Sequence, residues 1–272
     1  MNKQFGFHEG DSFLHILNPL AKFLSLIFIM IGILIYPSLT LTIFFLLLTL
    51  IGFRVAQVPL ELSHNRVRFL LVFSVLLLVL QVMVISNGNV IIYLVPVLNG
   101  TGPFFPITDY GISVGLVFAT RFLLIVLSSM LFVSVTDPTL LAHSLARSGV
   151  PYRYSFALII SLRFLPLFDA ESDMVRMAQR ARGITYDVRS IHGILASIRY
   201  TFYPLLVSAL SRVDTLSMSM DGRGFGYDTH RTYVRFAKWR KRDSFLMILS
   251  LGFLILCVLF SFNILPFPLI LF

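Results

Sequence analysis

Long apolar segments dominate this chain and decide what it can fold into. Five of them approach or reach the roughly 20 residues that an α-helix needs to cross the hydrocarbon of a bilayer. They cover residues 20–35, 39–53, 69–85, 112–135 and 245–265. Charged residues make up only 13% of the chain, about half of the share in soluble domains. We therefore predict an all-α membrane protein with about five transmembrane helices.

The distribution of Lys and Arg predicts the orientation of these spans. Both residue types mark the cytoplasmic side of a membrane protein, and neither occurs in residues 87–111 or 263–272. Sixteen of the 22 lie between residues 137 and 243, which places that segment in the cytoplasm. The N-terminus is then cytoplasmic and the C-terminus extracytoplasmic. Arg121 is the exception inside the fourth span, where it serves a function, snorkels to the membrane interface or pairs within the bundle.

This topology divides the chain into three parts. Residues 1–136 form an N-terminal transmembrane domain of four spans, residues 137–243 a cytoplasmic domain, and residues 244–272 the final transmembrane helix. The stretch from Val90 to Leu98 is apolar but too short to cross a bilayer alone.

The cytoplasmic domain is expected to be helical. The predicted helices cover residues 139–147, 152–182 and 191–221. Asp137 and Pro138 begin the domain, because Asp caps free amides and Pro suits a first turn. Pro166 and Pro204 lie within the two long helices and are expected to kink them, as hinges or as simple accommodations. The first of these helices is apolar on most faces of its first half, so it contacts the membrane, a partner or the other long helix.

A short repeat marks the ends of the two long helices. Six positions recur at an offset of 41 residues: Asp173, Met177, Arg182, Gly183, Tyr186 and Asp187 match Asp214, Met218, Arg223, Gly224, Tyr227 and Asp228. Glycine just past a helix end caps the last carbonyls, and a nearby arginine favours the negative end of the helix dipole. Helix capping is therefore one interpretation of each Arg-Gly pair.

The other interpretation is that each helix end inserts into a partner. A small residue before the arginine allows close approach, and the guanidinium makes several directed hydrogen bonds. Two matched ends predict two matched sockets, and hence a partner that is a dimer of like subunits. The residues predicted to bind it are Ala181, Arg182, Gly183, Gly222, Arg223 and Gly224.

The chain resembles the transmembrane T component of energy-coupling factor (ECF) transporters over nearly its whole length. The similar runs include Thr136-Asp137-Pro138, Gly149-Val150-Pro151, Arg163-Phe164-Leu165-Pro166, Ala178-Gln179-Arg180-Ala181-Arg182-Gly183 and Gly222-Arg223-Gly224-Phe225-Gly226. The family has two Ala-Arg-Gly-like motifs that end its coupling helices. The first motif matches outright here, whereas the second has Gly222 in place of alanine.

The resemblance implies a non-catalytic subunit, without a cofactor, of an ATP-driven importer in a prokaryotic cell membrane. Two ATP-binding cassette ATPase subunits, identical or homologous, would hold the arginine-tipped helices of a coupling domain at residues 137–243. A separate substrate-binding membrane S component would then reorient and release a vitamin or a transition metal such as cobalt or nickel. The T component itself would bind neither ATP nor, directly, the solute.

Other classes of protein fit the sequence less well. An enzyme or metal site needs a cluster of nucleophiles or ligands, and the six His residues form no i, i+4 pair. A stand-alone membrane permease or channel is the alternative, although the spans hold few polar groups beyond Gln81 and Arg121. The basic residues 231–242 directly precede the last span, which favours contact with anionic lipid headgroups over nucleic acid.

Overall fold

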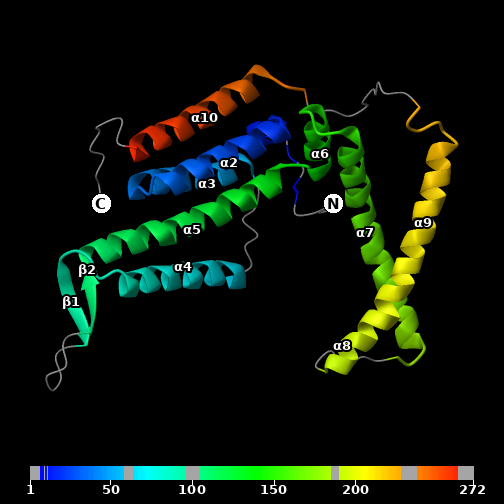
Figure 1. Cartoon of the computed structure of the whole chain (residues 1–272), viewed down its shortest axis with the longest axis horizontal. Helices are drawn as coiled ribbons and strands as arrows, with labels where there is room; N and C mark the ends of the chain where they lie inside the picture. The colour runs from blue at the N-terminus through cyan, green and yellow to red at the C-terminus, as the bar shows by residue number, and fades with distance from the viewer. Residues whose placement is uncertain are drawn as a thin grey trace. The chain divides into compact units, whose positions relative to one another are not determined.

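The computed structural model describes residues 7–8, 10, 12–57, 64–95, 104–184, 190–227 and 238–262. Backbone contacts divide the chain into two compact units, which are Met1–Ser144 with Ala237–Phe272, and Leu145–Phe236. Figure 1 shows the helices of both units as ribbons. Each unit is described in turn.

The first unit is a bundle of apolar helices with one hairpin. Its helices are α1 (Phe13–Ile16), α2 (Pro19–Ile35), α3 (Leu39–Val55), α4 (His64–Val84), α5 (Asp109–Val135) and α10 (Lys241–Ser261). The strands β1 (Val90–Val95) and β2 (Phe104–Thr108) pair antiparallel, with Val90 opposite Thr108. The sequence did not predict this hairpin. It indicated only that the apolar run that begins at Val90 is too short to cross a bilayer.

Helix α5 lies at the centre of this bundle and contacts α2, α3 and α4, while α10 packs along α2 (Figure 1). Small residues allow these close approaches, as is common between membrane helices. A Cβ on Gly32 of α2 would lie 2.8 Å from the ring of Phe253 in α10, and one on Gly115 of α5 would lie 3.0 Å from the Leu78 carbonyl in α4.

The predicted class, an all-α membrane protein, is confirmed. Among the described residues, four helical stretches are long and apolar enough to cross a membrane: Val67–Val84, Asp109–Val135, Gly193–Asp221 and Lys241–Ser261. Three of them coincide with predicted spans. Helices α2 and α3 are apolar but have only 17 residues each. The stretch Gly193–Asp221 falls in the segment predicted to be cytoplasmic, so the number of spans and the side of each terminus stay predictions.

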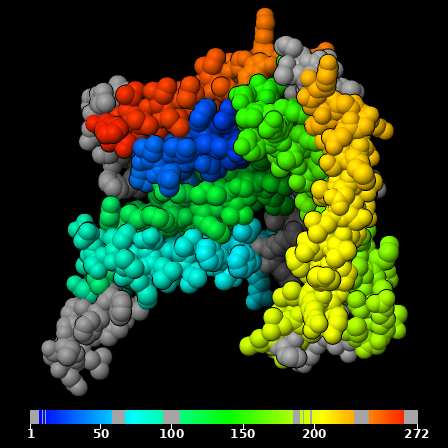
Figure 2. Space-filling model, turned by 45° about the vertical axis from the view of Figure 1, so that its right-hand side comes forward, coloured from blue at the N-terminus to red at the C-terminus, as the bar shows by residue number. Residues whose placement is uncertain are grey.

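The second unit contains two long helical segments that follow one another in the chain. Helix α7 (Tyr152–Ala181) is followed by α8 (Ile191–Ser197), the π-helical turn η1 (Ile198–Phe202) and α9 (Tyr203–Asp221). Figure 2 shows the atoms of α9, in yellow, on the surface of the molecule. The prediction of one helix over residues 191–221 was right in extent but missed the π-helical turn.

Helix α6 (Pro138–Arg147) extends across the boundary between the units. Its start is as predicted, because the Asp137 carboxylate accepts a hydrogen bond from the Thr139 N–H at 2.8 Å. Gly149, with φ +105°, follows the end of α6, and Pro151 directly precedes α7. Asp137 therefore caps the start of α6, and Gly149 and Pro151 lie in the turn between α6 and α7.

Candidate functional site

The first arginine tip is a tightly capped helix end. Gly183 has φ +75°, a left-handed conformation that favours glycine. The Ile184 N–H donates to the Gln179 carbonyl at 3.1 Å, and the Gly183 N–H donates to the Arg180 carbonyl at 3.0 Å. This pair of bonds is the Schellman motif, which satisfies the last carbonyls of a helix. Arg182 is the capping residue and is exposed.

The second arginine tip has the same backbone geometry 41 residues later. Gly224 has φ +68°. The Phe225 N–H donates to the Met220 carbonyl at 3.0 Å, and the Gly224 N–H donates to the Asp221 carbonyl at 2.9 Å. Arg223 therefore occupies the position that Arg182 has in the first tip, and it too is exposed. Both glycines therefore cap their helix ends, as the first interpretation of the Arg-Gly pairs expected. The contact of the arginines with a partner stays a prediction.

The small residues beside the arginines are also placed at the tips. Ala181 is the last residue of α7 and Gly222 directly follows α9, and both are exposed. A Cβ on Gly183 or Gly224 would meet no other atom within 4 Å among the described residues. These glycines are therefore needed for their backbone conformation and not for space. Tyr186, Asp187 and Asp228, the remaining members of the sequence repeat, lie outside the described residues, whereas Tyr227 is 96% exposed.

Helices α7 and α9 run antiparallel, so the two tips lie at opposite ends of the pair. Phe225, after the second tip, packs its ring 4.6 Å from the ring of Phe156 near the start of α7. At the other end, Gln179 contacts the segment that leads into α9. With about 1.5 Å of rise per residue, the interval from Phe156 to Arg182 separates the tips by about 40 Å.

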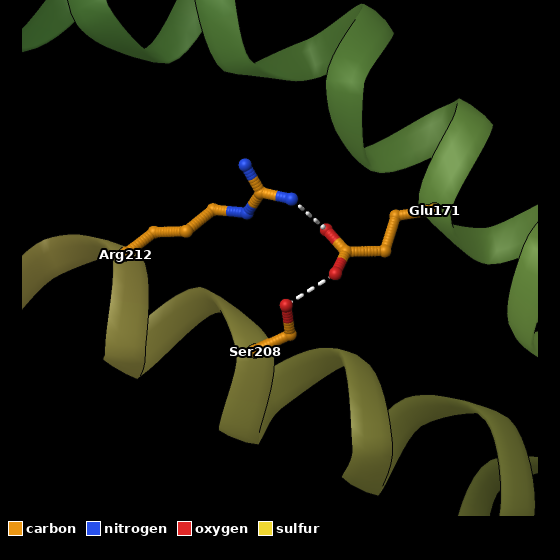
Figure 3. A network of polar contacts seen from close by, with 3 residues as sticks. All are labelled: Glu171, Ser208 and Arg212. Atoms are coloured by element: carbon orange, nitrogen blue, oxygen red, sulfur yellow. Dashed lines mark hydrogen bonds and ion pairs between the residues drawn. The ribbon is translucent and has the colours of Figure 1, made fainter.

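A polar cluster joins the middle of the two helices (Figure 3). Glu171 of α7 binds Arg212 of α9 through an ion pair of 3.1 Å. Its other carboxylate oxygen accepts a hydrogen bond from the Ser208 hydroxyl, one turn before Arg212. The carboxylate thereby fixes the lengthwise register of α7 against α9. A fixed register sets where the two arginine tips lie along the pair.

The first tip is held to the other helical segment by Gln179. Its side chain is 7% exposed, and its Nε2 donates to the Tyr200 carbonyl in η1 at 3.2 Å. Pro204, the second residue of α9, has no N–H to donate to that carbonyl four residues earlier. Of the two predicted hinge prolines, Pro204 therefore coincides with the change from π- to α-helix, whereas Pro166 lies within an uninterrupted α7.

Packing of α7 against α9 leaves much apolar side-chain surface uncovered. The side chains that are more than two-fifths exposed include Leu158, Leu165, Leu206, Leu210 and Val213. The sequence predicts that this apolar surface contacts the membrane, a partner or the other long helix. Packing of the two helices against each other thus buries only part of it. Exposed apolar side chains in this number are typical of a surface that contacts a membrane or another protein.

A second cluster, in the first unit, was not recognised from the sequence. Asp243 is fully buried at the start of α10, and its carboxylate accepts hydrogen bonds from the N–H groups of Asn18 at 2.9 Å and Arg240 at 2.7 Å. Lys22 donates to the Val135 carbonyl, at the end of α5, at 3.1 Å. We call these residues the anchor cluster, since they tie the starts of α2 and α10 together and α2 to the end of α5. Asn18 also caps the start of α2. An Asn directly before a Pro is a local signal for a helix start, and it is the part of this cluster that can be found in the sequence.

Arg121 pairs within the bundle, one of the three alternatives predicted for this residue. It is 8% exposed, and its guanidinium donates to the Ile33 carbonyl of α2 at 2.8 Å. It also lies 5.6 Å from the centre of the Phe118 ring, within cation–π range. Among the residues that the structure describes, no group of three or more His, Cys, Asp or Glu side chains is placed to hold a metal ion.

Comparison with known proteins agrees with the sequence motifs. Residues 10–234 match the family CbiQ, described as cobalt transport protein. The chain is 30% identical over 265 residues to the "energy-coupling factor transporter transmembrane protein EcfT" of Thermotoga maritima, an alignment that covers 92% of this chain and 90% of the relative. The protein of the same name from Streptococcus thermophilus is 31% identical, with coverage of 90% and 94%. The chain therefore belongs to the cobalt transport protein family, which confirms the predicted membership among the T components of energy-coupling factor transporters.

Proposed function

We propose that this transmembrane subunit transmits the ATP-driven movement of two ATP-binding cassette ATPase subunits, identical or homologous, to a substrate-binding membrane S component. The cargo is a vitamin or a transition metal ion such as cobalt or nickel. Arg182 and Arg223 contact one ATPase subunit each. The observation that supports this most is the equivalence of the two tips, which share one capped geometry and lie at opposite ends of the same helix pair.

The physical basis is rigid transmission along a helix pair. A capped helix end with a left-handed glycine has a fixed backbone, so the arginine beside it starts from a defined position. Guanidinium groups make directed, charge-assisted hydrogen bonds to carboxylates and carbonyls. The Glu171–Arg212 ion pair and the Gln179–Tyr200 bond connect the helices between the tips. A displacement of the ATPase subunits would therefore be transmitted through the tips to α7 and α9 together.

The exposed apolar side chains of α7 and α9 supply the second contact. We assign them to the S component and the membrane surface, with residues 137–243 forming the cytoplasmic coupling domain. The stretch Gly193–Asp221 has the length and hydropathy of a span, yet it carries Arg199, Arg212 and Asp214, which are costly at membrane depth. Placement at the membrane surface avoids that cost. The N-terminus is then cytoplasmic and the C-terminus extracytoplasmic.

Single and double replacement of the arginines tests this function. In complexes with the ATPases and the S component of the same transporter, Arg182→Ala or Arg223→Ala should weaken ATPase attachment or separate ATP hydrolysis from uptake. The double variant should do so more strongly than either single variant. Intact assembly and uptake in the double variant would refute the proposal. Uptake by the lone chain in liposomes would instead favour the permease or channel.

A further inference from the structure

The repeat at the two tips matches on the outside of the helices. Four of its pairs are described in both copies, namely Asp173 and Asp214, Met177 and Met218, Arg182 and Arg223, and Gly183 and Gly224. Every one of these eight residues is exposed, and the side chains of Met177 and Met218 are 62% and 69% exposed. The chain's own packing therefore leaves all of the matched positions exposed.

The inward positions of the same stretches do not match. At the offset of 41 residues, Val175 corresponds to Leu216, Gln179 to Met220 and Ile184 to Phe225, and all six are buried or half-buried. A repeat that served internal packing would match at these inward positions. Because identity is confined to exposed positions, the repeat is better explained by two similar surfaces outside this chain.

Capping explains the glycines and the dipole partly explains the arginines, but neither explains the Asp–Met pairs. These residues lie nine and five positions before each arginine, beyond the last turn in which helix-end effects act. Within each copy the aspartate and the methionine are four residues apart, so they are neighbours on one ridge of the helix. A single exposed methionine is common on protein surfaces. Two methionines at the same distance from an arginine, each four residues after an aspartate, require an explanation.

We propose that the Asp–Met pairs extend both partner sites, so that each socket binds a carboxylate, a thioether and a guanidinium in the same order. The inference rests on the proposed function and enlarges its contact surface. With about 1.5 Å of rise per residue, the methionine lies about 7.5 Å and the aspartate about 13.5 Å behind the arginine along the helix axis. Each socket therefore reaches more than two turns up its helix.

The chemistry of the socket follows from these side chains. A cationic group faces the aspartate, and an apolar hollow receives the methionine, whose flexible thioether adapts to irregular surfaces. Carbonyl or carboxylate oxygens receive the arginine. Since the two copies of the signature are alike, the two sockets carry like groups, as two identical or homologous ATPase subunits would.

Binding of purified ATPase subunits to the variant chain in detergent tests the extension. The variants are Met177→Gln and Met218→Gln, alone and together, and the pair Asp173→Asn with Asp214→Asn. The chain offers matched controls on α7: Met174 is 65% exposed but has no counterpart in the repeat, and neither does the exposed Asp169. Met174→Gln and Asp169→Asn therefore change the same chemistry on the same helix.

The double methionine variant should bind the ATPases about tenfold more weakly, the size of effect at a well-packed interface residue, and the double aspartate variant should also lose affinity. The two single methionine variants should lose affinity to a similar extent, and both controls should bind as the unmodified chain does. Unchanged binding in the methionine and aspartate variants, together with lost binding in the Arg182→Ala/Arg223→Ala variant, would overturn the extension and leave the proposed function standing. Unchanged binding in the arginine variant would overturn the proposed function itself.

Discussion

Removal of the Asp243 carboxylate should loosen the starts of α2 and α10. The fully buried group accepts N–H bonds from Asn18 at 2.9 Å and Arg240 at 2.7 Å. Hydrogen bonds to a charged group contribute about 1.5–3 kcal/mol each, and a donor left buried and unsatisfied is costly. Asp243→Ala should therefore lower the free energy of unfolding by roughly 3–6 kcal/mol. Asp243→Asn keeps one acceptor oxygen, so it should lower the free energy by about half as much.

The chain contains its own reporter for this experiment. Trp239 is its single tryptophan, and its indole N–H donates to the Ser244 hydroxyl at 2.7 Å, next to Asp243. Denaturant unfolding in detergent, followed by tryptophan fluorescence, should show the loss of stability at the start of α10. Asp169→Asn, on the exposed surface of α7, is the matched control. A change of less than about 0.5 kcal/mol in Asp243→Ala, the size typical of a neutral surface substitution, would refute the role of the anchor cluster.

Three further variants test the tips and the bundle. Gly183→Ala and Gly224→Ala place a Cβ on a left-handed backbone, which costs roughly 1–2 kcal/mol, so both variants should bind the ATPases more weakly. Gly222 has φ −64°, a conformation that alanine adopts without strain, so the control variant Gly222→Ala should bind normally. Gln179→Leu removes the bond to the Tyr200 carbonyl, so uptake per ATP hydrolysed should fall, and equal coupling would count against a rigid helix pair. Arg121→Met should lower stability by about 1–3 kcal/mol with ATPase binding unchanged, and lost binding in folded protein would instead indicate a role in transmission.

Local signals in the sequence predicted much of the fold. Apolar runs set the positions of the membrane helices, and proline, glycine and aspartate set several helix ends. The predicted helix at residues 152–182 is α7, Tyr152–Ala181, and Asp137 caps α6 as expected. The two tips could be found because each Arg-Gly pair and its capped end occupy only a few consecutive residues. Capping chemistry of this kind depends on near neighbours alone.

Features that depend on distant residues could not be predicted in the same way. Asp243 meets Asn18 across 225 positions of sequence, and no local pattern joins them. The hairpin of β1 and β2 was missed because a short apolar run has no unambiguous period. The π-helical turn before Pro204 was read as a kink within one helix, since proline signals a disturbed helix without specifying how the backbone adapts. The contact of Gln179 with that turn is likewise tertiary.

Photo-crosslinking from the two tips tests the central claim most directly. A photoreactive amino acid in place of Arg182 or Arg223, in the assembled transporter, should link each tip to an ATPase subunit, with the same region of that subunit captured at both positions. Crosslinks from either tip that reach only this chain or lipid would contradict the account.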